Sequence, residues 1–338
     1  MNVNQIVDRY NEEHLPFSGV VFVKKLNGEN YEQGHGYANR SDNIKNTTST
    51  RFGIASGCKI FTAVAIMQLV DQKKLDLDTL LSDCLDVPFP AFDSGITIRH
   101  LLTHSSGIPD YFDEEVMSDF AELWSSLPMY TMTSASAFLP MFQYRGMKFK
   151  PGERFSYSNA GFIVLGLIVE QVSGLTFQEY VQTHIFERCG MKDSGYFRLD
   201  QLPERTASGY IEQGTTWSSN LYSIPVIGGP DGGAFTTVHD LEKFWDALLG
   251  CQLLSPSSTG SLLSPQIQVN KEIHYGYGVW MRIQNNEIDK FYVMGNDPGV
   301  DMRSIVYPRL NTRIHILSNN GKGAGAIAGV LEEQLFEE

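Results

Sequence analysis

Residues 52–70 read Phe52-Gly53-Ile54-Ala55-Ser56-Gly57-Cys58-Lys59-Ile60-Phe61-Thr62-Ala63-Val64-Ala65-Ile66-Met67-Gln68-Leu69-Val70. The apolar residues after Lys59 recur at helical spacing and predict a long amphipathic helix, with Ser56 at or just before its first turn. Serine is a weak nucleophile at neutral pH, and a lysine one helical turn away can activate it. The pair indicates acyl-transfer chemistry, although Ser56 could instead cap the helix and Lys59 could be a solvated charge.

The composition narrows the classes of function. The chain has 338 residues, of which 42% are apolar and 19% are charged, and its formal charge is −13. This length accommodates one large or two interlocked domains. The negative charge argues against binding to nucleic acid or to anionic lipid, which attract Lys and Arg. The four cysteines are scattered and the eight histidines form no HExxH pair, so we expect reduced cysteines, no metal and no cofactor.

The sequence carries no visible membrane or export signal. No apolar run approaches the roughly 20 residues that a membrane-spanning helix needs. The first residues, Met1 to Asp8, lack the basic and apolar segments of a secretory signal. We therefore expect a cytoplasmic protein without a membrane span, unless a signal peptide has been removed.

Strand patterns lie near both ends of the chain, and helical patterns lie between them. Strands are expected at 18–23 and 31–37, joined by an Asn27-Gly28 turn, and at 275–283, 291–295, 302–307 and 312–318. Helices are expected at 5–13, 161–172, 240–249 and 324–336. The pattern predicts an α+β fold with one antiparallel sheet, in which residues 1–65 and 240–338 form a discontinuous sheet domain around a mainly helical domain of residues 66–239.

A second candidate group is Tyr157-Ser158-Asn159, which follows a Pro-Gly turn and opens an apolar helix. A phenol near a lysine can exchange protons with a serine and a leaving group, and an amide can orient the lysine or bind a substrate carbonyl. Tyr37-Ala38-Asn39 has the same short pattern. Its position at the end of the first hairpin favours a structural role.

Taken together, these segments closely resemble the serine β-lactamase and penicillin-binding-protein superfamily, in particular the branch of class C β-lactamases, DD-peptidases, D-aminopeptidases and esterases. The resemblance implies a β-lactamase/transpeptidase-like fold, with an antiparallel sheet flanked by helices. The matching segments follow the family's order and span most of the chain: Gly36 to Arg40, Phe52 to Lys59, Ile98 to Ile108, Pro151-Gly152 with Tyr157-Ser158-Asn159, and Gly232 to Leu241.

The resemblance also implies a serine hydrolase that acts through an acyl-enzyme. Ser56 would be the nucleophile, and either Lys59 or Tyr157 would take its proton. Asn159 would contact the substrate, and the backbone amides of Ser56 and Asn296, beside Gly295, would form an oxyanion hole. His100 and His104 are interpreted as structural parts of the loop around them.

The third motif of the superfamily has lost its polar side chains here. It is usually a strand triplet, Lys-Thr-Gly or His-x-Gly, whose cation binds a substrate carboxylate. Alignment on Pro298-Gly299 places Val293 at the cation and Met294 at the small polar position, while Gly295 remains. An ester, amide or related acyl substrate without a carboxylate, either a small molecule or a short peptide, is therefore favoured. Arg303 could replace the cation, although pairing with a nearby acid is favoured.

Other functions stay open. The chain could be a β-lactamase or a D-Ala-D-Ala-type peptidase, or a catalytically weak binding or regulatory member of the same fold. Gly321-Lys322-Gly323-Ala324-Gly325 resembles a phosphate-binding loop but lacks its spacing, so we interpret it as a strand-to-helix turn. The sequence leaves the oligomeric state open.

Overall fold

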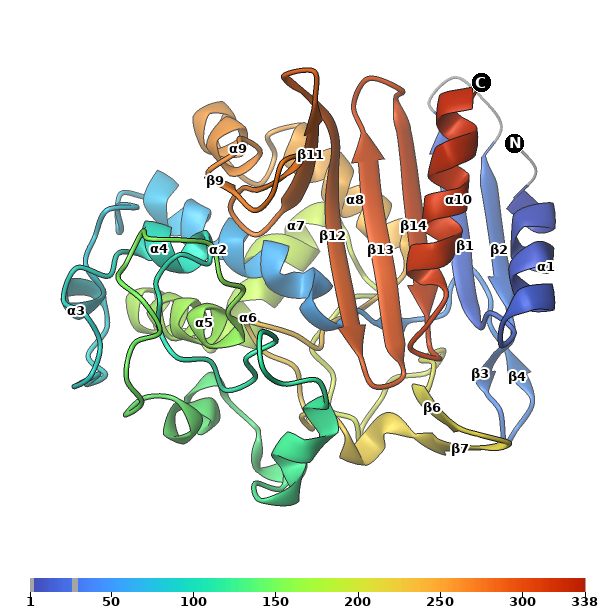
Figure 1. Ribbon diagram of the computed structural model, residues 1–338, viewed down its shortest axis with the longest axis horizontal. Coiled ribbons are helices and arrows are strands. Elements are labelled where there is room, and N and C mark those ends of the chain that lie inside the picture. Colours follow the sequence, from blue (N-terminus) through green and yellow to red (C-terminus); the bar gives the residue numbers. More distant parts are fainter. Residues whose placement is uncertain (1–2, 26–29, 338) are drawn as a thin grey trace.

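An eight-stranded antiparallel sheet dominates the computed structural model, which describes residues 3–25 and 30–337 (Figure 1). Pairing of β1 with β14, from Gly19 opposite Ser318 to Lys25 opposite Thr312, joins the two ends of the chain. This confirms the predicted α+β fold; the Asn27-Gly28 turn lies outside the described residues. In spatial order the strands are β2 (Tyr31–His35), β1 (Gly19–Lys25), β14 (Thr312–Ser318), β13 (Val300–Tyr307), β12 (Glu287–Asp297), β11 (Trp280–Gln284), β10 (Ile273–Tyr275) and β9 (Ile267–Gln268).

Helices cover both faces of the sheet, as Figure 1 shows. On one face, α1 (Val3–Glu13) and α10 (Ala324–Glu337) pack on alternate strand residues such as Val21, Ile305 and Ile316. On the other face, α2 (Lys59–Asp71) and α8 (Val238–Leu249) belong to the larger hydrophobic cluster, which takes the intervening strand residues. Both faces of the central strands are therefore buried, because successive side chains of a strand point to opposite faces.

The helix α2 differs from the amphipathic helix that its sequence predicts. Every side chain from Lys59 to Leu69 is buried. The helix lies between the sheet and several other helices, among them α5 (Asn159–Ser173) and α9 (Pro256–Leu262). A helix that is apolar around its whole circumference is typical of a protein core. The Lys59 side chain is therefore buried, 2% exposed, rather than solvated.

Two predicted strands are interrupted at glycines. The strand expected at 31–37 divides at Gly36, which has a φ of 66°, so that β3 (Tyr37–Asn39) leaves the main sheet and pairs with β4 (Ile44–Lys45). The strand expected at 275–283 is instead a hairpin of β10 and β11 with a turn at 276–279, where Gly278 has a φ of 72°. Glycine adopts such positive φ values without steric cost.

The middle of the chain forms the helical region at the left of Figure 1. The predicted domain boundaries at 65/66 and 239/240 stay a prediction. Beyond the elements already given, the chain forms α3 (Leu81–Cys84), α4 (Ile98–Leu102), η2 (Phe120–Ser125), η3 (Met129–Thr131), η4 (Ala135–Met141), α6 (Phe177–Val181), η5 (Gln182–Phe186), α7 (Glu187–Cys189), η6 (Asn220–Tyr222) and the paired strands β6 (Tyr210–Gln213) and β7 (Thr216–Ser219).

No single helix within 3–25 and 30–337 is long and apolar enough to cross a membrane. The helix α5 has the length and apolar composition of a membrane span only when it is counted together with residues 177–189. These two segments are bent by 77° relative to each other. All eleven residues from Asn159 to Val169 of α5 are buried within the protein.

Candidate active site

Ser56 lies on a tight turn between a short strand and the central helix. The strand β5 (Phe52–Gly53) pairs with β8 (Phe235–Thr236), and the 3₁₀ turn η1 (Ala55–Cys58) leads directly into α2. Ala55 has a φ of 45°, which is unfavourable for a residue with a Cβ. Its carbonyl accepts a hydrogen bond from the Gly233 amide at 3.2 Å. Surrounding structure thus holds the backbone immediately before Ser56 in a strained conformation.

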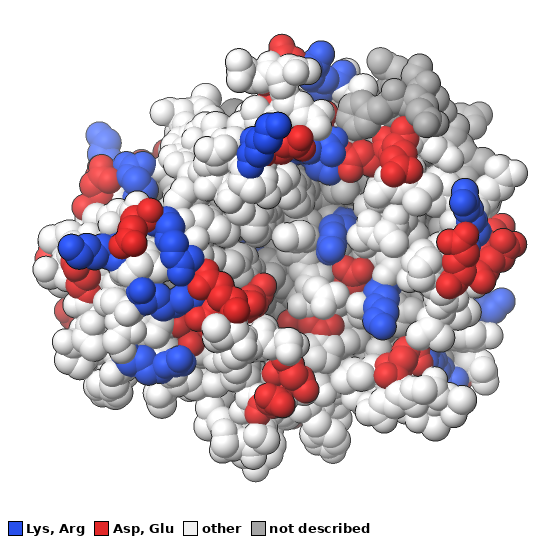
Figure 2. All heavy atoms as spheres, viewed as in Figure 1, with Lys and Arg blue, Asp and Glu red and all other residues white. Residues whose placement is uncertain are grey.

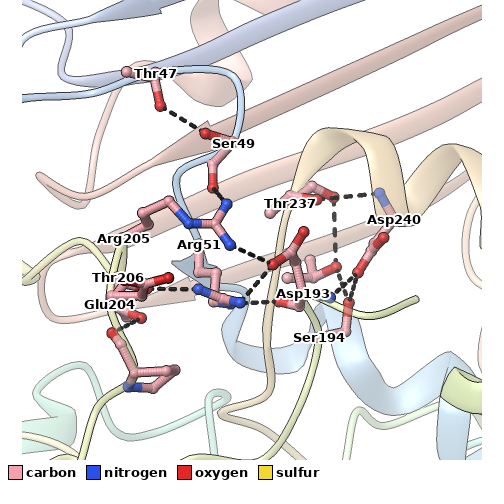
Figure 3. A network of polar contacts seen from close by, with 12 residues as sticks. Thr47, Ser49, Arg51, Asp193, Ser194, Glu204, Arg205, Thr206, Thr237 and Asp240 are labelled. Carbon is pink, nitrogen blue, oxygen red and sulfur yellow. Dashed lines mark hydrogen bonds and ion pairs between the residues drawn. The ribbon is translucent and has the colours of Figure 1, made fainter. Parts of the chain in front are cut away.

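A polar network anchors the segment that leads to this turn (Figure 3). The Arg51 guanidinium donates to a carboxylate oxygen of Asp193 at 2.5 Å and to the Glu204 carbonyl at 2.5 Å. Asp240, at the beginning of α8, accepts from the Asp193 amide at 2.8 Å and from the Ser194 hydroxyl at 2.9 Å. The network connects the start of β5 to the loop at 193–206 and to α8, and so fixes the approach to Ser56.

The Lys59 side-chain nitrogen contacts Ser56 directly. Its Nζ lies 2.9 Å from Ser56 Oγ, 2.8 Å from Asn159 Oδ1 and 2.6 Å from the Asp231 carbonyl oxygen. The amide oxygen of Asn159 and the Asp231 carbonyl can only accept, so they engage two N–H groups of Lys59. The third position of Nζ faces Ser56 Oγ and carries either a proton or a lone pair. The same geometry therefore suits a charged lysine and a neutral lysine that accepts the serine proton.

Tyr157 packs beside this pair. Lys59 Nζ lies 4.9 Å from the centre of the Tyr157 ring. Burial and the nearby charge of Glu114 raise the pKa of Tyr157 well above 10, and a hydrogen bond with Ser56 opposes this shift. The phenol is therefore protonated at neutral pH, and it contacts Ser56 as a potential proton donor.

Two residues whose importance the sequence did not indicate hold Tyr157 and Asn159 in place. The buried Asp110 carboxylate accepts from the backbone amides of Asn159 at 2.6 Å and Ala160 at 3.0 Å, at the beginning of α5. His104, interpreted as structural, accepts from the Ser158 amide at 3.0 Å, and its ring centre lies 4.4 Å from that of Tyr157. Burial raises the pKa of Asp110 to about 7 and lowers that of His104 well below 6.5.

The strand β12 lies directly against the turn that carries Ser56. A Cβ on Gly295 would lie 2.2 Å from the Ile54 carbonyl oxygen and 2.9 Å from the Ser56 amide nitrogen. β11 pairs with β12 only as far as Tyr292, whereas β13 pairs with it through Asp297. Residues 293–297 therefore present one edge without a strand partner near Ser56. The placement of the Asn296 amide in an oxyanion hole fits this arrangement and stays a prediction.

The position predicted for the missing cation is apolar. Val293 is 4% exposed and belongs to the larger hydrophobic cluster. Met294 lines an open cleft that reaches Ser56. Arg303 also lines the cleft, but it forms an ion pair with Asp301 at 2.9 Å, as favoured from the sequence. Among the described residues that line the cleft, Lys322 is the other surface cation.

Two cavities meet at Ser56. The outer cleft, of about 780 Å³, is lined by Tyr157, Trp280 and residues 294–299, among others. Figure 2 shows this face hollowed between the helical region and the sheet, with acidic side chains along the lower side of the hollow. An inner chamber of about 200 Å³ opens on the other side. Both cavities are lined by Ser56, Phe120, Asn159, Asp297 and Gly299.

Carboxyl groups outnumber cations around the two cavities. The acids Glu114, Asp119, Glu212, Asp231 and Asp297 line one cavity or both. Burial raises the pKa of Asp297 to about 7; Lys59 opposes the shift, and the charges of Asp231 and Glu114 add to it. No group of three His, Cys, Asp or Glu side chains within 3–25 and 30–337 is arranged to hold a metal ion.

Residues 3–297 match the family described as Beta-lactamase. The chain belongs to this family. A solved penicillin-binding protein from Bacillus halodurans superposes with a TM-score of 0.94 at 48% identity, covering 98% of this chain and 100% of that one. An octameric penicillin-binding protein homologue from Pyrococcus abyssi has a TM-score of 0.85 at 27% identity, covering 100% of this chain and 78% of that one.

Among curated relatives, penicillin-binding protein 4* from Bacillus subtilis is 28% identical over 340 residues, covering 94% of this chain. The chain spans 71% of the length of that relative, and 65% and 45% of the lengths of two others. The relatives thus confirm the resemblance to β-lactamases and penicillin-binding proteins.

The structure brings together most residues predicted for the Beta-lactamase family site. Ser56, Lys59, Tyr157 and Asn159 meet at one point, and Gly295 and Asn296 lie on the adjoining strand. Their catalytic roles stay predictions. The sequence reasoning missed Asp110, Asp231 and Asp297. In the sequence, Asp231 stands out through its position in the glycine-rich turn at 228–233. The turn brings its backbone carbonyl to the start of α2.

Proposed function

We propose that this protein is a serine hydrolase that forms an acyl-enzyme on Ser56. The observation that carries the proposal is the 2.9 Å contact of Lys59 Nζ with Ser56 Oγ, while two other acceptors occupy the remaining N–H groups of the lysine. A nucleophile in hydrogen-bond contact with a base that is itself oriented by a third group is the arrangement required for covalent catalysis. Membership of a family of serine hydrolases agrees with it.

The geometry divides the proton transfers between two groups. Lys59 accepts the Ser56 proton as the Oγ–carbon bond forms, because the Tyr157 phenol is already protonated and cannot accept one. Tyr157 donates its proton to the leaving group as the bond to that group breaks. Lys59 then returns a proton to the tyrosine. Water hydrolyses the acyl-enzyme by the same transfers in reverse, which releases a carboxylic acid and restores Ser56.

We further propose an ester or amide substrate that lacks a free carboxylate near the scissile bond. Val293 offers no charge at the usual cation position, and Arg303 is neutralised by Asp301. The carboxyl groups of Glu114 and Asp297 would repel a second carboxylate. The preference for a substrate without a carboxylate rests on the third-motif residues and on this electrostatic argument.

Turnover of p-nitrophenyl butyrate and nitrocefin by matched variants tests the proposal. Wild type and Ser257→Ala, whose serine is exposed on α9, should hydrolyse the ester much faster than nitrocefin, and Ser56→Ala should hydrolyse neither. Rapid hydrolysis of nitrocefin or of a D-Ala-D-Ala peptide would favour the β-lactamase or peptidase alternative. Absence of turnover and of any covalent adduct would favour a binding or regulatory role.

The duplicated Tyr-x-Asn triplet supplies a control for Tyr157. Tyr157→Phe should lower the acylation rate by about a hundredfold or more, because the leaving group loses its proton donor. Tyr37→Phe, on the exposed β3 of the small hairpin, should retain the wild-type rate. Equal rates for the two variants would remove Tyr157 from the mechanism.

A further inference from the structure

The inner chamber that meets Ser56 is enclosed mainly by apolar side chains. Many of them come from four parts of the chain that the sequence does not mark as functional: the loop at 197–202, the segment 221–227, and the 3₁₀ helices η2 and η4. The described side chains that line it include no Lys or Arg, and its two carboxyl groups belong to Asp231 and Asp297. The Asp231 carboxylate already accepts a hydrogen bond from Tyr111.

The position of Tyr157 indicates which cavity holds the leaving group of the substrate and which holds its acyl chain. Tyr157 lines the outer cleft and not the inner chamber. If the proposed function holds, Tyr157 protonates the leaving group, which must then occupy the outer cleft. The carbon attached to Ser56 Oγ carries its remaining substituent, the acyl chain, on the other side. Ser56 lines both the outer cleft and the inner chamber, so the inner chamber is the cavity open to the acyl chain.

We propose that the inner chamber binds the acyl group of the substrate and selects an uncharged, apolar chain of medium length or a single phenyl ring. The inference rests on the proposed function and names its substrate class. At roughly 30 Å³ for each water-sized group, a volume of 200 Å³ holds on the order of six heavy atoms. The carbons beyond the carbonyl of butyryl to heptanoyl groups, or a single phenyl ring, match this size, whereas long fatty acyl chains exceed it.

The charges around the chamber also suit the chemistry of both steps. In acylation, Ser56 Oγ bonds to the carbonyl carbon and gives its proton to Lys59, while the bond to the leaving group breaks and that group takes a proton from Tyr157, which Lys59 then reprotonates. In deacylation, water supplies the hydroxyl that converts the acyl group into an acid. The apolar chain of the acid then leaves a chamber whose described lining residues include no Lys or Arg that would bind it by charge.

A series of p-nitrophenyl esters from acetyl to dodecanoyl tests the inference. For wild type, kcat/KM should rise by roughly threefold to fourfold for each added methylene until the chamber is full, and then fall. Leu199→Trp, which fills the chamber, should collapse the ratio of hexanoyl to acetyl turnover. Ile224→Ala, which enlarges it, should move the optimum to longer chains, and this variant tests the inference even if Leu199→Trp fails to fold. Met117→Trp, in the outer cleft, should leave the ratio unchanged.

The outcomes separate the inference from the function on which it rests. Intact-mass detection of an acyl adduct on Ser56, with a flat chain-length profile that neither chamber variant alters, would overturn the acyl chamber and leave the serine hydrolase standing. A ratio that responds to Met117→Trp and not to Leu199→Trp would place the acyl group in the outer cleft and overturn it as well. No adduct with any ester would overturn both.

Discussion

Lys59 Nζ donates a hydrogen bond of 2.8 Å to Asn159 Oδ1, and this contact joins the beginnings of two helices that are a hundred residues apart in the chain. Asn159 is itself fixed, since its backbone amide donates to Asp110 at 2.6 Å. Lys59, which contacts Ser56, is therefore positioned by α5 as well as by its own helix α2. Loss of the amide should disturb Lys59 without altering Ser56 itself.

Asn159→Ala should slow acylation of Ser56 by about tenfold to a hundredfold, because a buried N–H of Lys59 loses its acceptor. Stopped-flow release of p-nitrophenol in a single turnover measures this rate. Asn39→Ala provides the control, since Asn39 belongs to the similar triplet and its side chain bonds to Asp42 within its own hairpin. If both variants acylate at the wild-type rate, the Lys59–Asn159 contact has no role in activation.

Gly295→Ala should impair both activity and stability. The added Cβ would meet the Ile54 carbonyl oxygen at 2.2 Å, so β12 and the turn at Ser56 must separate. We expect a cost of about 1–3 kcal/mol in unfolding free energy together with loss of acylation. Gly329→Ala on the exposed side of α10, where a Cβ meets nothing within 4 Å, should instead be neutral or slightly stabilising. Urea unfolding compares the two; equal effects would contradict the close approach.

Asp297 should make the enzyme discriminate against anionic substrates in a pH-dependent way. Burial raises the pKa of its carboxyl to about 7, so the group is protonated at pH 5 and ionised at pH 9. The acylation rate of a carboxylate-bearing ester, relative to a matched neutral ester, should fall by about tenfold over this range. The ratio should stay flat in Asp297→Asn. Asp83→Asn, exposed on α3, should behave as wild type, and a falling ratio in Asp297→Asn would exclude this role.

Glu242 should stabilise the fold at neutral pH and lose this contribution in acid. Burial raises its pKa, but hydrogen bonds from His315 and Lys24 dominate and lower it to about 2. A depressed carboxyl pKa stabilises the native state above the unfolded value near 4.5, and the contribution disappears as the pH falls through 2. The unfolding free energies of wild type and Glu242→Gln should therefore differ at pH 7 and converge below pH 4.5. Glu287→Gln, at an exposed ion pair, should show little difference at either pH.

Much of the fold was predictable because its strands and helices follow strong local patterns. The turn-bounded runs of β13 and β14, which contain β-branched residues, and the apolar run of α5 predict these elements directly. The breaks at Gly36 and within 276–279 were missed, since a glycine inside a strand pattern permits a turn without requiring one. The burial of α2 on all sides depends on neighbours that only the tertiary fold supplies.

The candidate site, like the fold, could be predicted from the sequence only in part. Ser56, Lys59, Tyr157 and Asn159 were found because their spacing and surroundings match a known family. Asp231 contributes a backbone carbonyl to Lys59, and any residue type can provide a carbonyl. Asp110 acts through two backbone amides of α5. The apolar walls of the inner chamber look like ordinary core residues in the sequence, because only the fold leaves a space between them.

Covalent labelling of Ser56 tests the central claim most directly. After incubation with a fluorophosphonate, the intact mass should increase by one adduct, and peptide mapping should place it on Ser56. Ser56→Ala should show no adduct, and Lys59→Met should label at least a hundredfold more slowly, because the serine has lost its base. An unlabelled wild-type protein, or equal labelling of wild type and Lys59→Met, would contradict the account.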